Sequence, residues 1–116
     1  KTKFETFVHK IKPYGINLRT SYHNEAWPAQ MNMNTKFMNC ARKAFEKSYG
    51  TTPIFTGEGG TIPIIAEFKR ILGLDTIMMG FNLPDDGIHS PNEKFGVDNY
   101  LKGIETAIYF YQELAK

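Results

Sequence analysis

Two short segments hold the residue types best suited to chemistry, and the first is the glycine-rich run at residues 57–61, Gly-Glu-Gly-Gly-Thr. Glycines let a ligand approach the backbone closely, and the free N–H groups at the start of a following helix attract a carboxylate. A plain strand-to-helix turn would use the same residues. The segment also lacks the Lys of a phosphate-binding loop and the spaced glycines of a dinucleotide site. From the residues alone, both interpretations stay open.

The second segment contains His89, which lies in a loop bounded by Pro84 and Pro91. A neutral imidazole in such a loop could ligate zinc or relay a proton. Zinc needs three or four ligands, however, and no others stand at a recognisable spacing, so the residues alone favour a solvated loop histidine. Asp85 and Asp86 could form a pair of carboxylates, but adjacent residues in a loop seldom converge on one point, and ordinary turn chemistry suffices to explain them.

Four helices must position these segments, because apolar residues recur every three or four positions in four stretches. The stretches are residues 4–11, 37–45, 65–72 and 97–114. Asn34 or Thr35 can cap the second helix and Gly50 ends it, while Pro63 and Gly73 bound the third. Helices are therefore predicted over much of the chain.

Three further segments have the pattern of β-strands. Residues 16–22 alternate apolar and polar, residues 53–56 form a brief β-like run, and residues 76–81 form an apolar run typical of a buried strand. Alternation of helices and strands after residue 33 predicts an α/β fold with helices packed on a mostly parallel sheet. Ligands of such sheets bind beyond the carboxyl ends of strands, so loops 57–61 and 82–93 are expected on one edge.

Composition excludes several classes of protein. The 116 residues carry 14 Lys+Arg against 12 Asp+Glu, a net charge of +2 without a basic cluster, which argues against nucleic acid as a partner. No apolar stretch approaches the roughly 20 residues needed to cross a membrane. The single cysteine, Cys40, cannot form an intrachain disulfide, so we expect a reducing, cytoplasmic environment. The chain begins at Lys1 rather than Met, and we interpret it as a fragment.

Three ordered blocks carry a family resemblance: residues 58–63 (Glu-Gly-Gly-Thr-Ile-Pro), residues 79–86 (Met-Gly-Phe, then Leu-Pro-Asp-Asp) and residues 89–94 (His-Ser-Pro-Asn-Glu-Lys). The chain resembles the carboxy-terminal part of the di-zinc metallopeptidases that include carnosinases, non-specific dipeptidases, aminoacylases and glutamate carboxypeptidases. The resemblance implies a catalytic α/β domain and an α+β lid domain. Residues 1–24 would be the last helix and strand of the lid, 25–33 a connector, and 34–116 the carboxy-terminal segment of the catalytic domain.

The resemblance also implies roles for individual residues. His89 corresponds to a metal ligand, which reverses the interpretation from the residues alone, and the turn near the metals would bind substrate through Glu58, Gly59, Gly60 and Thr61. Asn92 and Glu93 would hold the His89 loop by hydrogen bonds. Many relatives carry Arg where Gly57 stands and Ser where Thr61 stands. The change at Thr61 keeps a hydroxyl, but the change at Gly57 removes a charge, so the resemblance does not define the substrate preference. The general base and the remaining ligands belong to the amino-terminal half of such enzymes, so no catalytic residue is expected in this chain.

The leading hypothesis is thus a carboxy-terminal fragment of a metal-dependent dipeptidase or amidohydrolase, in which metal-activated water hydrolyses a peptide or an N-acyl amino acid. The complete enzyme would hold two zinc ions or other divalent metals and form a homodimer through the lid. The isolated chain, without its partner amino-terminal half, is expected to be inactive and to retain no metal. A rival hypothesis is a non-catalytic α/β interaction module in which the edge strand Ile16–Tyr22 pairs with another chain.

Overall fold

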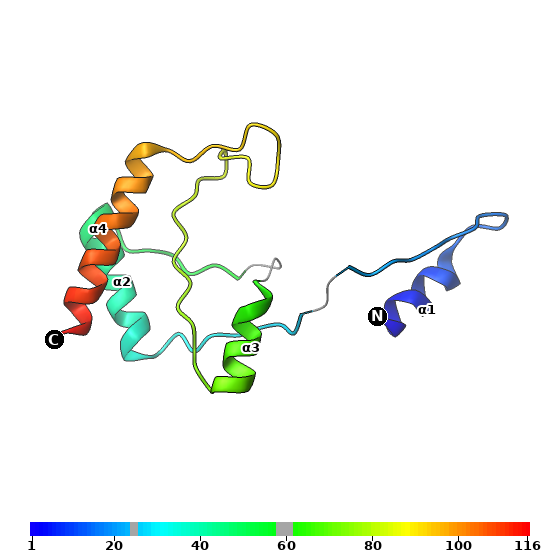
Figure 1. Cartoon of the computed structure of the whole chain (residues 1–116), viewed down its shortest axis with the longest axis horizontal. Coiled ribbons are helices and arrows are strands. Elements are labelled where there is room, and N and C mark those ends of the chain that lie inside the picture. The colour runs from blue at the N-terminus through cyan, green and yellow to red at the C-terminus, as the bar shows by residue number, and fades with distance from the viewer. Residues whose placement is uncertain (24–25, 58–61) are drawn as a thin grey trace.

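Four α-helices form where the apolar spacing predicts them in the computed structural model, which describes residues 1–23, 26–57 and 62–116. Figure 1 labels them in chain order: α1 (Thr2–Ile11), α2 (Lys36–Tyr49), α3 (Pro63–Leu72) and α4 (Val97–Leu114). All four predicted helices are confirmed. Among the described residues, no helix is both long enough and apolar enough to cross a bilayer.

Local signals at the helix ends explain these boundaries. Thr35 caps α2, because its hydroxyl accepts a hydrogen bond from the Met38 N–H at 3.1 Å. Gly50 and Gly73 end α2 and α3 in the left-handed conformation, with φ of 72° and 66°. Pro63 stands in the first turn of α3, where its missing N–H costs no helical hydrogen bond.

The predicted α/β fold is wrong for the described residues, which contain helices but no strand. Residues 16–22, 53–57 and 76–81 run without regular secondary structure, and no backbone ladder joins them to each other. Neither the mostly parallel sheet nor the last strand of a lid is therefore present in the part of the chain that is described.

The reason is that a strand is stable only beside other strands or against a helix. Residues 53–57 and 76–81 run in different directions across the view in Figure 1, and residues 16–22 lie apart from both. Residues 76–81 were expected to form a buried strand, but Ile77, Met79 and Phe81 are only half-buried and Met78 is exposed. The apolar run is present in the sequence, but these residues lack a neighbouring strand.

The main packed contact joins α2 to α4. Small and flexible side chains of α2 are buried there: Met38, Cys40, Ala41 and Ala44. The two buried residues of α4 are polar: Thr106 is fully buried, and Glu113 is only 5% exposed. The Ser48 and Thr106 hydroxyls lie 2.6 Å apart, and Lys47 Nζ lies 2.6 Å from Glu113 Oε1. Hydrogen bonds and an ion pair therefore join the two helices in addition to the apolar packing.

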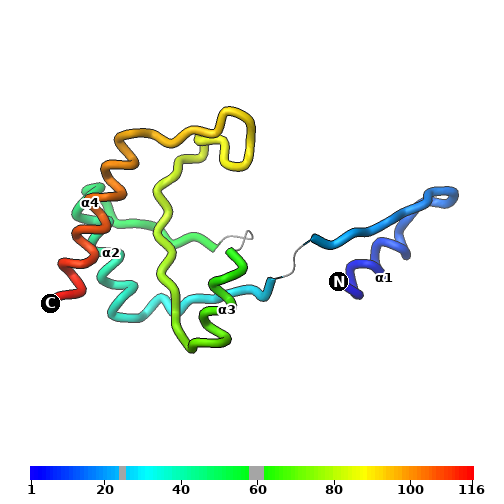
Figure 2. Tube along the Cα trace, in the orientation of Figure 1, coloured from blue at the N-terminus to red at the C-terminus, as the bar shows by residue number. Residues whose placement is uncertain are grey.

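The whole chain is elongated, with dimensions of 63 × 37 × 20 Å. Figure 2 shows α1 and the segment after it set apart from the other three helices. No residue of α1 is buried, and its Phe4 and Phe7 side chains are more than half exposed. The amino-terminal arm, residues 1–23, is therefore separate from the body that contains the candidate site.

Candidate metal-ligand loop

Residues 83–94 form a loop that is anchored by Asp86. One carboxylate oxygen of Asp86 accepts a hydrogen bond from the Leu83 N–H at 2.7 Å, and the Asp86 N–H donates to the Leu83 carbonyl at 3.1 Å. The Asp86 carbonyl in turn accepts from the Lys94 N–H at 2.9 Å. Asp86 is only 3% exposed. A single buried residue thus ties together the two ends of the loop, which Figure 1 shows between residues 76–81 and α4.

His89 lies in the middle of this loop with an exposed side chain. Its φ of 61° is in the left-handed region, which is uncommon for residues other than glycine but several times more frequent for His and Asn. Hydrogen bonds brace the turn on both sides: the Ser90 N–H donates to the Gly87 carbonyl at 3.0 Å, and the Glu93 N–H donates to the Ser90 carbonyl at 3.3 Å. The loop therefore presents an accessible imidazole on a constrained backbone.

Asn92 and Glu93, which are expected to support His89, lie in the same loop, together with Asp85. Asn92 also has a left-handed φ, of 62°, and is exposed. Asp85 forms an ion pair with Lys94, its carboxylate oxygen 2.9 Å from Nζ. The hydrogen bond from Lys94 lowers the pKa of Asp85, and the same bond raises the pKa of Lys94. Asp85 and Asp86 are thus not a catalytic pair: one pairs with a lysine in solvent and the other anchors the backbone.

The residues present do not by themselves fit a metal ion. Across residues 1–23, 26–57 and 62–116, no three His, Cys, Asp or Glu side chains gather closely enough to hold one. Zinc sites take at least three protein ligands, and His89 supplies one imidazole. The described part of the chain therefore offers at most one ligand to a centre whose other ligands come from elsewhere.

The predicted substrate-binding turn, Glu58, Gly59, Gly60 and Thr61, lies outside the described residues. Its two flanks are described. Gly57 precedes it with an exposed backbone, and Pro63 opens α3 after it. Its proximity to His89 stays a prediction.

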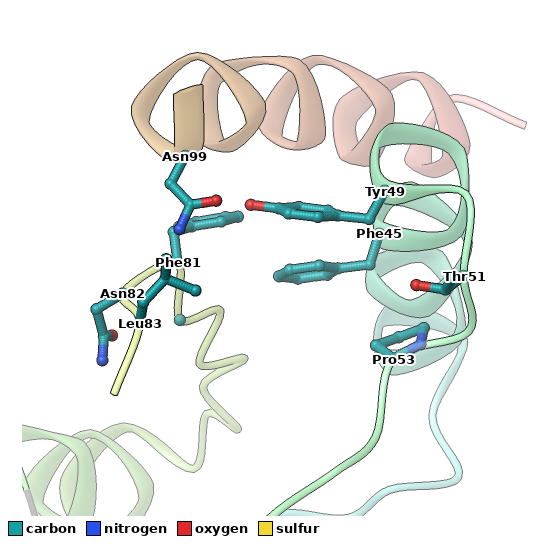
Figure 3. A pocket seen from close by; sticks show the side chains of 9 residues that line it. Phe45, Tyr49, Thr51, Pro53, Phe81, Asn82, Leu83 and Asn99 are labelled. Atoms are coloured by element: carbon teal, nitrogen blue, oxygen red, sulfur yellow. The ribbon is translucent and has the colours of Figure 1, made fainter. Parts of the chain in front are cut away.

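Sequence reasoning missed an aromatic cluster that connects the loop to the helices. The Phe45 ring stacks on Tyr49 and on Phe81, with centroids 5.7 and 5.3 Å apart. Figure 3 shows these rings lining an open pocket, with the Asn99 side chain reaching into it from α4. A Cβ on Gly103 would lie 3.4 Å from the Phe81 ring, so the ring packs closely against α4 at this glycine. The cluster fixes the position from which the loop departs.

A usable signal for the cluster was present in the sequence. Phe45 and Tyr49 stand four residues apart on one predicted helix face, which is the spacing of side chains that meet. Their partner Phe81, however, is distant along the chain, and no local sequence pattern predicts its contact with Phe45. Asp86 carried a weaker signal still, because an Asp before a glycine is common in any turn.

Comparisons with known proteins find similarity over most of the chain. Residues 5–113 match the family model described as "Peptidase family M20/M25/M40". The chain is 43% identical over 74 residues to a Cys-Gly metallodipeptidase of Schizosaccharomyces pombe, a match that covers 64% of the chain and 16% of that protein. It is 35% identical over 92 residues to a Beta-Ala-His dipeptidase of Rattus norvegicus, covering 79% of the chain and 18% of that protein.

A solved structure is also similar. The dipeptidase Dug1p from Saccharomyces cerevisiae superposes with a TM-score of 0.67 at 34% identity, over 71% of this chain and 17% of that chain. The chain therefore spans less than a fifth of the length of these relatives.

Proposed function

Because this chain belongs to peptidase family M20/M25/M40, we propose that it forms the carboxy-terminal part of the catalytic domain of a metal-dependent dipeptidase. The relatives named as dipeptidases support hydrolysis of a dipeptide as the reaction. The observation that carries the proposal is the loop around His89, in which buried Asp86 fixes the backbone and the imidazole is left accessible. A ligand that must reach a metal held by other residues needs this combination.

In this proposal His89 supplies one metal ligand, and the segment Glu58–Thr61 binds substrate. Asn92 and Glu93 keep the loop in shape. Residues 1–24 belong to the end of a lid domain, residues 25–33 connect, and residues 34–116 complete the catalytic domain. We also propose that zinc is the metal, that the complete enzyme forms a dimer through the lid, and that it is cytoplasmic.

The 116 residues alone are not expected to hydrolyse a dipeptide. One accessible imidazole supplies a small part of the binding free energy of a complete zinc site, which is about 10–16 kcal/mol. Among the described residues, no second or third ligand lies beside it. We therefore expect neither tight metal binding nor dipeptide hydrolysis without the rest of a family M20 chain.

The experiment is a chimera in which this chain replaces the matching segment of full-length Saccharomyces cerevisiae Dug1p. We expect His89→Ala to lower the affinity of the chimera for zinc, and its hydrolysis of Cys-Gly, by about 100-fold or more. The matched control is His9→Ala, which removes an exposed imidazole from α1. A His89→Ala chimera with unchanged zinc content and activity would refute the proposal.

The rival interaction module has no supporting observation. It required an edge strand at residues 16–22, and this segment forms no strand within the described residues.

A further inference from the structure

The backbone around His89 forms a β-turn. The Ser90 N–H donates a hydrogen bond to the Gly87 carbonyl at 3.0 Å, which closes a turn of four residues. His89, the third residue of this turn, has a φ of 61°, whereas the φ of Ile88 before it is not positive. A positive φ at the third position alone is the pattern of a type II turn. Ile88 and His89 are therefore the two central residues of one turn.

This turn does not require an apolar side chain at Ile88. The second position of a type II turn has a φ near that of proline, and most other residues adopt it too. The turn that follows has Pro91 at its second position and Asn92, with a φ of 62°, at its third. It is closed by the Glu93 N–H, which donates to the Ser90 carbonyl. The backbone conformation alone therefore does not explain the isoleucine.

Ile88 is also not used to stabilise the loop. Its side chain is 48% exposed. The side chains that fix the loop are those of Asp86, whose carboxylate accepts from the Leu83 N–H, and of Ser90, whose hydroxyl donates to a carbonyl of the same turn. An exposed apolar side chain beside His89 stabilises a complex when an apolar part of a ligand covers it.

The charges near the turn favour an apolar ligand side chain at Ile88. Asp85 and Lys94 pair with each other, with 2.9 Å between the carboxylate oxygen and Nζ. Asp86 is buried and its carboxylate already accepts a backbone hydrogen bond. A charged ligand side chain beside Ile88 would therefore lose hydration without gaining an opposite charge from these three residues, whereas an apolar one would lose no such hydration.

We infer that Ile88 contacts the side chain of the first residue of a dipeptide substrate and makes the enzyme prefer a branched apolar side chain there. This inference rests on the proposed function, because it takes His89 to lie at the reacting bond. The reacting carbonyl of a dipeptide belongs to its first residue, so the side chain of that residue is the nearer of the two to the reacting atoms. Ile88 and His89 leave one turn from Cα atoms about 3.8 Å apart, so a substrate at the imidazole has Ile88 beside it.

The test compares the hydrolysis of Leu-Gly and Gly-Gly by the Dug1p chimera, because these dipeptides differ only in the first side chain. We expect the unmodified chimera to prefer Leu-Gly. Ile88→Ala should lower the ratio of the two kcat/KM values by about 10-fold or more. Ile88→Val removes one carbon and keeps the branch, so it should lower the ratio by about threefold.

Binding is measured separately from activity. A Leu-Gly analogue with a reduced peptide bond is not hydrolysed, and its Kd is compared by calorimetry with that of the Gly-Gly analogue. Ile88→Ala should weaken binding of the first analogue by a similar factor and leave the second unchanged. The matched control is Leu83→Ala, because Leu83 lies at the base of the same loop and is 47% exposed. It should leave both ratios unchanged.

Three results would overturn the inference. An Ile88→Ala chimera that loses activity equally on both dipeptides would show that Ile88 supports only the fold. Ratios that change as much in Leu83→Ala would show the same. Faster hydrolysis of Lys-Gly than of Leu-Gly by the unmodified chimera would show that an acidic residue of the loop, such as Glu93, sets the preference instead.

The proposed function fails on a different result. If His89→Ala leaves zinc binding and hydrolysis unchanged while Ile88→Ala changes the ratio, Ile88 contacts substrate and the ligand role of His89 is wrong. If His89→Ala abolishes zinc binding while Ile88→Ala leaves the ratio unchanged, the proposed function stands and the role of Ile88 is wrong. An unmodified chimera that hydrolyses no dipeptide would refute both.

Discussion

At the scale of single residues, the loop 83–94 fixes the backbone of His89 while its side chain stays exposed. The imidazole of His89 is accessible, and its backbone has a left-handed conformation. This conformation costs free energy, which the surrounding contacts must offset. Asp86 and Ser90 supply the hydrogen bonds that do so. The conformation of the loop therefore depends on Asp86, which is buried, while the His89 side chain stays exposed.

Replacing Asp86 should show this dependence. Asp86→Ala leaves the Leu83 N–H without its side-chain acceptor and should lower the free energy of unfolding by about 1–3 kcal/mol. In the Dug1p chimera it should also weaken zinc binding. Urea unfolding and zinc titration measure the two effects. The control is Asp85→Ala, which removes an exposed ion pair of little consequence. Equal effects of the two substitutions would show that Asp86 does not anchor the loop.

Gly87 offers a second test of the same loop. Its φ is 67°, and an added Cβ would lie 2.8 Å from the Ser90 hydroxyl, so Gly87→Ala should destabilise the chain by about 1 kcal/mol or more. Gly96→Ala is the matched control, because Gly96 has no atom within 4 Å of the added Cβ and a φ of −66°. Thermal unfolding compares them. If Gly96→Ala proves as harmful as Gly87→Ala, backbone strain is not the cause.

At the scale of elements, α2 and α4 are joined through charged and hydroxyl side chains. Glu113 lies between Lys116 and Lys47, and their hydrogen bonds lower its pKa from 4.5 to about 2. The same contact raises the pKa of Lys47. Lys102 adds a hydrogen bond from α4 to the Ser48 carbonyl at the end of α2.

This arrangement predicts a pH dependence of stability. Because the folded pKa of Glu113 is below its unfolded value, its carboxylate stabilises the fold fully above pH 4.5, and this contribution is lost as the pH falls toward 2. Glu113→Gln should therefore be less stable than the unmodified chain at pH 6, and the difference should shrink between pH 4.5 and pH 2. Urea unfolding across this range measures it. A difference that does not vary with pH would contradict the assigned pKa.

The elements also show which parts of the fold the sequence predicts. Helices follow from residues close in the chain, such as the Thr35 cap and Gly50, and all four were predicted. Strands depend on partners distant along the chain, and residues 76–81 have the pattern of a strand without the pairing. The apolar spacing of α4 predicted the helix, but it did not reveal that Thr106 would face α2. The apolar spacing of a sequence identifies the apolar face of a helix, but it does not identify the element that packs against that helix.

The candidate site was predictable to a similar degree. His89 was identified through a family resemblance, since the residues alone favoured a solvated histidine. The anchoring role of Asp86 and the stacking of Phe81 on Phe45 arise from contacts that only the folded chain makes.

At the scale of the whole molecule, the amino-terminal arm and the body behave as separate parts. Within the arm, Thr20 donates a hydrogen bond to Glu5, so α1 and the segment after it fold back on each other. We expect removal of residues 1–23 to leave the thermal unfolding midpoint of the α2–α4 body unchanged within about 2 °C, because α1 buries no residue. Circular dichroism measures this. A large loss of stability would show that the arm supports the body.

The central claim is that His89 completes a metal centre built by a longer family M20 chain. The most direct measurement is the crystal structure of the Dug1p chimera grown with zinc, with the metal located by its anomalous scattering. The claim predicts a zinc ion about 2.0–2.1 Å from a ring nitrogen of His89, with the remaining ligands supplied by the Dug1p portion. A fully coordinated zinc ion with the His89 imidazole in solvent would contradict it.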